Sequence, residues 1–135
     1  MTSDLIVTAA GGKLIGLDPE NGAVVWENGL DGGGHGEVAL AITEQRIFAS
    51  ASRGALFCLA YPSGTQLWTA KTSSSGRATI LVEGPNVLVA KHGHIDCYDV
   101  SSGDRRWSSP LPGHGTVAIG VPGNVVQADE YGEEA

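Results

Sequence analysis

LIGLDPENGAVVW, at residues 14–26, is the first of three copies of one pattern in this chain. The second copy is LFCLAYPSGTQLW at residues 56–68, and the third is IDCYDVSSGDRRW at residues 95–107. All three tryptophans end a copy, at spacings of 42 and 39 residues, and the glycines four residues before them keep the same spacings. A repeat of roughly 40 residues built of short strands is typical of a β-propeller blade.

The apolar residues of the chain do not recur at a helical period. Short runs of Val, Ile, Leu and Ala alternate with turns rich in Gly, Ser, Asn and Pro, which predicts an all-β fold. The runs are nearly continuous, as expected when both faces of a sheet are covered. We therefore predict propeller blades of four antiparallel strands, about three blades per chain.

The strands of a blade are named A to D from the central channel outwards. Residues 1–128 hold the repeats, and residues 129–135 form an acidic tail. The predicted segments are strands B to D of a first blade at 5–26, a second blade at 37–68, a third blade at 78–107, and strands A and B of a partial blade at 116–128.

Three blades do not normally close a ring, because propellers need four to eight. The first repeat lacks strand A, and residues 116–121 supply a surplus one. If this strand completes the first blade of a second copy, two chains close a six-bladed ring. The further strand B at 125–128 has no place in that ring. The alternative is that the chain is a fragment of a longer propeller, which would explain both ragged ends equally well.

The repeated pattern, an Asp followed by Gly and then Trp at intervals of four, resembles the blades of the pyrroloquinoline-quinone-like propeller family. The matching residues are Asp18, Gly22 and Trp26 in the first copy, Gly64 and Trp68 in the second, and Asp99, Gly103 and Trp107 in the third. The second copy departs from the pattern, with Ala60 in place of Asp. The resemblance implies a structural role: each Trp docks against the neighbouring blade, and hydrogen bonds hold the Asp-to-Gly turn.

The same family includes quinone-dependent alcohol dehydrogenases, and other members act as scaffolds, outer-membrane assembly components or sensor domains. The chain has no adjacent cysteines of the kind that pack on the quinone, and no recognisable set of Glu, Asn and Asp for calcium. Cys58 and Cys97 occupy the same slot in successive repeats, so we expect free, buried thiols. No serine lies on a Gly-x-Ser-x-Gly elbow. We expect no cofactor and no enzymatic activity.

Histidines are the best candidates for a binding site. His35 and His114 occupy equivalent slots just before a strand A, Arg77 occupies the same slot of the intervening repeat, and His92 and His94 flank Gly93 in a hairpin. We expect all of them on one face. They could bind a divalent metal such as zinc, or an anionic or peptide ligand, or they could be simple structural repetition. The last interpretation is favoured, so no metal ligand is assigned and the face remains a possible ligand face.

The formal net charge of −7 argues against nucleic acid or an anionic membrane as a partner. No apolar run approaches the roughly 20 residues of a membrane span, and the first residues resemble no export signal. The sequence therefore predicts a cytoplasmic, non-catalytic binding or scaffold module. Its expected partner is a second copy of itself, most simply in a homodimer, and a protein or peptide is a further candidate partner.

Overall fold

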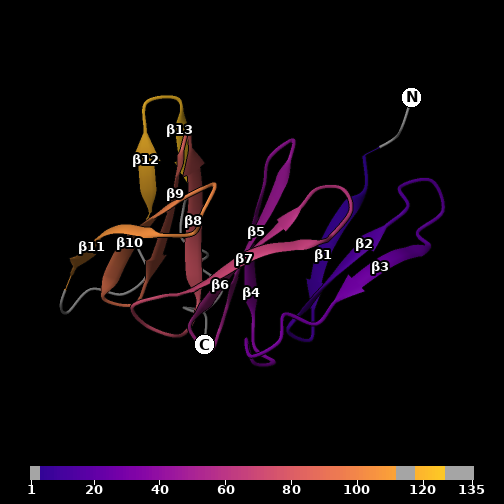
Figure 1. Cartoon of the computed structure of the whole chain (residues 1–135), viewed down its shortest axis with the longest axis horizontal. Helices are drawn as coiled ribbons and strands as arrows, with labels where there is room; N and C mark the ends of the chain where they lie inside the picture. Colours follow the sequence, from indigo (N-terminus) through magenta and orange to yellow (C-terminus); the bar gives the residue numbers. More distant parts are fainter. Residues whose placement is uncertain (1–3, 112–117, 127–135) are drawn as a thin grey trace.

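The computed structural model describes residues 4–111 and 118–126. Every regular element in these residues is a β-strand, which confirms the all-β prediction. The strands form three antiparallel sheets that stand side by side like blades, followed by a hairpin (Figure 1). No helix occurs in the described part of the chain, so none there could cross a membrane.

The three sheets are called blades 1, 2 and 3, in chain order. Blade 1 contains β1 (Ile6–Ala10), β2 (Lys13–Leu17) and β3 (Val24–Asn28). Blade 2 contains β4 (Val38–Ile42), β5 (Arg46–Ala51), β6 (Ala55–Ala60) and β7 (Gln66–Lys71). Blade 3 contains β8 (Ala78–Glu83), β9 (Asn86–Lys91), β10 (His94–Asp99) and β11 (Arg105–Pro110). The hairpin contains β12 (Ile119–Val121) and β13 (Asn124–Val126). In every blade, neighbours in sequence are neighbours in the sheet.

Each sheet has the same irregularity at the same place. In each blade, strand C shifts its register with strand D just after the residue that pairs with the tryptophan. These pairs are Gly16 with Trp26, Cys58 with Trp68, and Cys97 with Trp107. Such a bulge increases the local twist of the outer strand. The two cysteines thus occupy equivalent slots, as predicted, and both are free and buried.

The hydrophobic core lies between the blades. Leu14 of blade 1 and Leu30 of the loop after β3 pack against Ile47 and Leu59 of blade 2. The opposite face of blade 2 packs on blade 3, with Phe48 and other buried side chains between them. Blade 2 is covered on both faces, and its strands β5 and β6 are buried almost throughout. This explains why its apolar runs are continuous rather than alternating.

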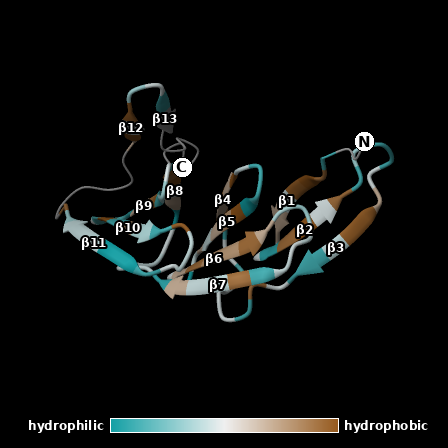
Figure 2. Ribbon diagram, turned by 45° about the horizontal axis from the view of Figure 1, so that its top comes forward, coloured by the Kyte–Doolittle hydropathy of each residue, from teal (hydrophilic) through white to brown (hydrophobic). Residues whose placement is uncertain are grey.

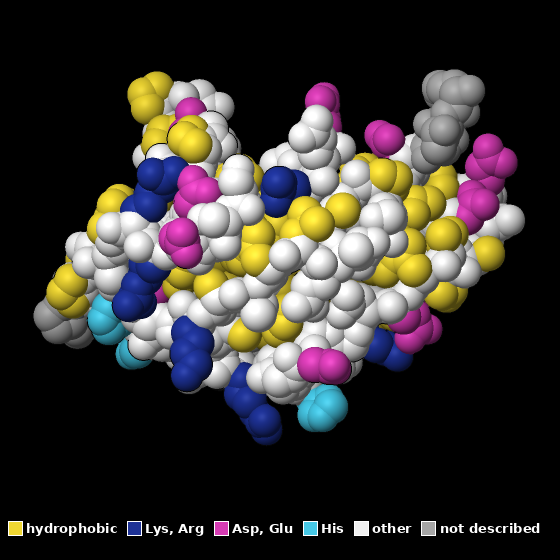
Figure 3. Space-filling view, viewed as in Figure 1, with side chains coloured by type: hydrophobic (Ala, Val, Ile, Leu, Met, Phe, Trp, Pro, Cys, Tyr) yellow, Lys and Arg dark blue, Asp and Glu magenta, His cyan; other side chains and the backbone are white. Residues whose placement is uncertain are grey.

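The two ends of the stack are less well covered. On the outer face of blade 1, the side chains of Ile6, Val24 and Val25 are 51%, 56% and 54% exposed. At the other end, Ile119 of β12 packs on Leu81 and other residues of blade 3. Figure 2 shows hydrophobic segments in β1 and β3 at one end and in β12 at the other, and exposed hydrophobic side chains are visible at both ends in Figure 3.

The partial fourth blade has a place for its second strand. The sequence assigned residues 116–128 to strands A and B of this blade, and β13 pairs with β12 in antiparallel register, from Ile119 opposite Val126 to Val121 opposite Asn124. The predicted segment at 116–128 is thus a two-stranded hairpin within residues 119–126. Its remaining residues, like the acidic tail at 129–135, lie outside the described residues.

Candidate functional site

Loops that carry the candidate binding residues meet on one face of the molecule. At blade 1, a Cβ on Gly12 in the first hairpin would lie 2.4 Å from the carbonyl oxygen of Gly34 in the following loop. At blade 2, Arg53 N donates to Gly33 O over 3.1 Å. At blade 3, Ser74 Oγ donates to His92 O over 3.1 Å. The loops before strands A therefore share a face with the hairpins between strands B and C, and histidine and basic side chains gather along this edge in Figure 3.

His35 lines the larger of two cavities beside β1. This cavity of about 580 Å³ is bordered by the end of β1, the Gly11–Gly12 turn, and the segment from His35 to Val38 at the start of β4. A second cavity, of about 570 Å³, is bordered by Asp4 just before β1 and by Ile42 at the end of β4. The two hollows thus lie at opposite ends of the space beside β1 and β4.

Arg77 forms an ion pair across two blades. Its Nε lies 3.0 Å from Oε1 of Glu37, and its Nη2 donates to Oε2 of the same carboxylate over 3.1 Å. This two-pronged geometry is the strong form of an Arg–carboxylate contact. The positive charge of Arg77 is therefore largely matched by Glu37, which reduces its value for an anionic ligand.

The remaining histidines do not form a ligand set. His94 begins β10 and is partly buried, with a buried Nδ1 that has no hydrogen-bond partner among the described residues. His114 lies outside the described residues. Within residues 4–111 and 118–126, no group of three His, Cys, Asp or Glu side chains is placed to hold a metal ion.

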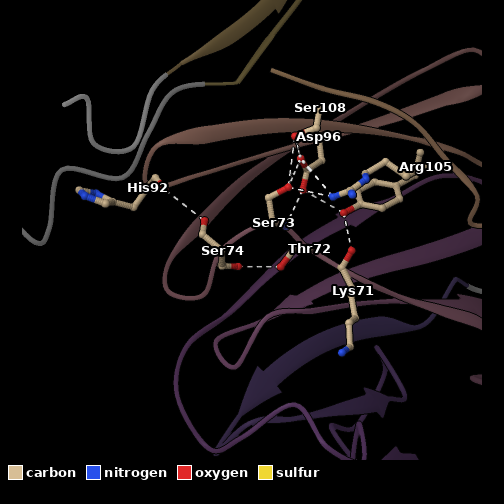
Figure 4. A network of polar contacts seen from close by, with 9 residues as sticks. Lys71, Thr72, Ser73, Ser74, His92, Asp96, Arg105 and Ser108 are labelled. Atoms are coloured by element: carbon tan, nitrogen blue, oxygen red, sulfur yellow. Dashed lines mark hydrogen bonds and ion pairs between the residues drawn. The ribbon is translucent and has the colours of Figure 1, made fainter. Parts of the chain in front are cut away.

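A polar cluster that the sequence did not indicate lies between blades 2 and 3 (Figure 4). Asp96 is buried, with its side chain 3% exposed. It accepts hydrogen bonds from Ser73 N and Ser73 Oγ, both at 2.7 Å, and from Ser108 Oγ at 2.7 Å. The Tyr98 hydroxyl lies 3.0 Å from Asp96 Oδ2 and 2.7 Å from Lys71 O. Arg105 Nη1 donates to Ser73 Oγ over 2.9 Å.

This cluster is suited to structural work rather than catalysis. Burial alone raises the pKa of Asp96, but the hydrogen bonds from Ser108, Ser73 and Tyr98 outweigh it and hold the pKa below its ordinary value. A carboxylate with a low pKa is a weak base, so it would not activate the Ser73 hydroxyl as a nucleophile. The cluster instead fastens the segment after β7 to β10.

Lys91 is a second buried charge at the same junction. Its side chain ends β9, is buried, and donates from Nζ to Ala51 O over 3.0 Å. Burial lowers the pKa of Lys91 to about 8, against the opposing attraction of Asp96. The signal for both residues was in the repeat: Asp96 stands where blade 2 has Phe57, and Lys91 stands where blade 2 has Ala51.

The three Asp-to-Gly turns, here called docking turns, are residues 18–22, 60–64 and 99–103. Each is closed by the glycine N–H donating to the carbonyl oxygen of the first residue, over 2.8, 2.9 and 2.8 Å. Asp18 Oδ1 also accepts from Glu20 N, and Asp99 Oδ2 accepts from two backbone N–H groups. Arg106 forms an ion pair with Asp99. The turn that begins with Ala60 keeps the same backbone bond without a carboxylate.

Two of the tryptophans dock on the turn of the next blade. Trp26 Nε1 donates to Pro62 O over 2.7 Å, and Trp68 Nε1 donates to Val100 O over 2.9 Å. Each indole lies directly over the turn glycine: a Cβ would stand 2.5 Å from the Trp26 ring at Gly64, and 2.5 Å from the Trp68 ring at Gly103. These glycines also have φ of +80°, which disfavours any side chain.

The model of the PQQ_2 family, described as "Outer membrane protein assembly factor BamB", matches residues 2–130. The chain belongs to the PQQ_2 family. The chain matches none of the curated proteins.

Solved structures share the fold at low sequence identity. BamB from Moraxella catarrhalis has 24% identity and a TM-score of 0.58, with 85% of this chain and 33% of that protein covered. A europium-containing methanol dehydrogenase has 19% identity and a TM-score of 0.64, with 78% and 22% covered. The computationally designed Ika4 protein has 18% identity and a TM-score of 0.75, with 97% and 82% covered. The chain thus spans about a fifth of the dehydrogenase and a third of BamB, and its neighbours include both an enzyme and an assembly factor.

Proposed function

We propose that this chain is a non-catalytic propeller module that scaffolds or binds proteins, and that it assembles with a second copy by completing a blade between the two chains. The observation that carries the assembly is the edge of β1. In blades 2 and 3, a strand A pairs with strand B, as β4 with β5 and β8 with β9. Among the described residues, β1 pairs only with β2.

The surroundings of β1 are suited to an incoming strand. The cavities of about 580 and 570 Å³ lie at its two ends, where the ends of a strand A would extend. Ile42, which lines the cavity of about 570 Å³, is 44% exposed. Burying such apolar side chains would stabilise an assembly by roughly 25 cal/mol per Å² of area removed from water.

The strand offered by the second copy is β12, which packs next to blade 3 as the strand A of a further blade. Its edge towards strand B is occupied by β13 over three residue pairs. To pair with β1 of another copy, β12 must release β13. The edge of β1 is five residues long, enough to receive the three residues of β12, and each backbone hydrogen bond contributes about 0.5 to 1.5 kcal/mol.

Two observations support a non-catalytic role. The family description names an assembly factor, and the hydrogen-bonding capacity of the Asp96 cluster is used in joining blades. The dehydrogenases among the neighbours share the fold at low identity, which does not carry their activity over. The partner chemistry that we propose is therefore protein or peptide, besides the second copy, and we propose the cytoplasm as its place.

A second candidate is a sensor for a metal ion or small molecule at the histidine-bearing face. The cavity beside His35 favours it, because about 580 Å³ falls within the usual range of ligand sites. Titration with zinc separates the two: if zinc binds and His35→Ala abolishes the binding, the sensor is supported, whereas unchanged binding in that variant would exclude His35 as a ligand.

The assembly is tested by light scattering coupled to size exclusion, over a dilution series of the 135-residue chain. We expect a sharp peak at about twice the 13.9 kDa of one chain, with dissociation on dilution. A monomer at every concentration would contradict the assembly and favour a segment of a longer propeller. A ladder of larger species would contradict closure by two copies.

A further inference from the structure

One tryptophan and one docking turn have no counterpart within the described residues. Trp107 is 47% exposed, and its indole donates no hydrogen bond to any residue of 4–111 or 118–126. At the other end of the stack, a Cβ on Gly22 would meet nothing within 4 Å. At Gly64 and Gly103 the same atom would meet an indole ring.

The free turn has the geometry of the two that are occupied. Gly22 has φ of +76°, against +80° at both Gly64 and Gly103. The closing hydrogen bond from Gly22 N to Asp18 O measures 2.8 Å, as it does at Gly103. The turn at 18–22 is therefore preformed for an indole, and preformed sites bind with less loss of conformational freedom.

Trp107 is also presented as its docked equivalents are. It pairs with Cys97 at the same bulge where Trp68 pairs with Cys58. The β12–β13 hairpin covers the inner part of the face of blade 3 that points away from blade 2, where Ile119 packs on Leu81 and Ala90. The outer part, formed by β11, remains exposed.

We propose that Trp107 of one copy docks on the turn at residues 18–22 of another copy, with its ring over Gly22 and its Nε1–H donated to a carbonyl oxygen of that turn. This inference rests on the assembly proposed above and identifies the residues of its junction. In a closed pair of chains the contact occurs twice, the two contacts being related by the twofold axis.

Charge supports a second copy as the occupant of this turn. Trp107 follows Arg105 and Arg106, which pair with Asp96 and Asp99 of their own chain but keep 48% and 43% of their side chains exposed. The free turn carries Asp18 and Glu20, which these exposed guanidinium groups would face. The two junctions within the chain have no such pairing of opposite charges, because the uncharged Val25 and Leu67 precede the docked tryptophans. Complementary charges at the rim favour this partner and speed encounter more than they add affinity.

The test compares four chains by sedimentation velocity over a dilution series: wild type, Trp107→Ala, Gly22→Ala and Gly93→Ala. Gly93 is the matched control, since it has φ of +84° and open space around its Cβ position. Gly22→Ala and Gly93→Ala carry the same backbone strain, but only the first blocks the turn. We expect Gly93→Ala to dimerise like the wild type. Trp107→Ala and Gly22→Ala should raise the dimer Kd by roughly thirtyfold or more, because a buried Trp is a typical hot spot.

Mixing the two damaged chains gives a sharper test. A pair of one Trp107→Ala chain and one Gly22→Ala chain keeps one intact junction, with Trp107 of the second docked on Gly22 of the first. The mixed pair should therefore be tighter than either homodimer. Trp107→Phe, which keeps an aromatic ring without the N–H donor, should have an intermediate Kd and provides a measurement if Trp107→Ala fails to fold.

The outcomes separate this inference from the assembly itself. If the wild type dimerises but Trp107→Ala and Gly22→Ala do so equally well, the junction is wrong while the assembly remains. If the wild type is monomeric throughout, the assembly is wrong and the junction fails with it. If mixing gives no tighter pair than the single variants, the contact does not run between Trp107 and Gly22 of different copies.

Discussion

Gly103→Ala tests how the blades are held together. The substitution acts in two ways: an alanine must adopt φ of +80°, and its Cβ would stand 2.5 Å from the Trp68 ring. The left-handed backbone costs about 1 to 2 kcal/mol. Because a ring cannot yield as a flexible chain end does, Trp68 must leave the turn.

The second cost follows from what Trp68 loses. Its Nε1 donates to Val100 O over 2.9 Å, and its ring lies 6.1 Å from the ring of Phe48. The hydrogen bond contributes about 1 kcal/mol, and the aromatic pair about 0.5 to 1.5 kcal/mol. We therefore expect Gly103→Ala to lower the free energy of unfolding by about 3 to 4 kcal/mol.

Urea denaturation followed by circular dichroism measures this loss, and tryptophan emission reports the displaced indole. The matched control is Gly93→Ala, where φ is +84° and a Cβ meets nothing within 4 Å. It should carry the backbone cost alone, with unshifted emission. Equal losses in the two variants, with no red shift for Gly103→Ala, would refute the docking argument.

Three other perturbations address the buried polar groups. Asp96→Asn should lower the free energy of unfolding by about 2 to 3 kcal/mol at pH 7, because an amide NH₂ would face the N–H and O–H donors that now surround the carboxylate. Since the folded pKa of Asp96 is depressed, the wild type should lose this advantage only as the pH falls below about 4. An advantage that stays undiminished below that pH would contradict this reasoning. Lys91→Met should change how stability depends on pH. Because the folded pKa of Lys91 is about 8 against an ordinary 10.5, the stability of the wild type relative to the variant should increase as the pH rises from 7 to 9.5, measured by urea melts at both values; a decrease would be inconsistent with burial of the lysine charge. Cys58 and Cys97, whose pKa values burial raises, should resist a thiol reagent in the native protein and react once urea unfolds it; rapid reaction in the native state would show that they are exposed.

The strand order and the blade identity could be predicted from sequence, because the signals are local. Gly11–Gly12 and the docking-turn glycines mark turns within a few residues, and the three tryptophans keep the repeat in register. Strand ends moved by up to three residues, since β7 ends at Lys71 and β11 at Pro110. For example, β3 runs on to Asn28 although Trp26 ends the repeated pattern, because pairing with β2 continues beyond it.

The pairings between blades were not predictable in the same way. Ser73 and Asp96 are 23 residues apart, and Arg77 and Glu37 are 40 apart, so their contacts depend on how blades pack. The sequence placed Arg77 on a ligand face, but it could not show that Glu37 from the adjacent blade matches its charge. Asp96 was visible only as a charged residue in a slot that is apolar in the other repeats.

Hydrogen–deuterium exchange at concentrations above and below dimer dissociation tests the joining of two copies most directly. The amides of β1 at Ile6–Ala10 should be better protected at high concentration, as β12 of a second copy pairs with their free edge, and those of β13 at Asn124–Val126 should become less protected in step. Unchanged exchange in both segments, in a sample whose mass doubles, would show that the copies meet through another surface and would contradict blade completion.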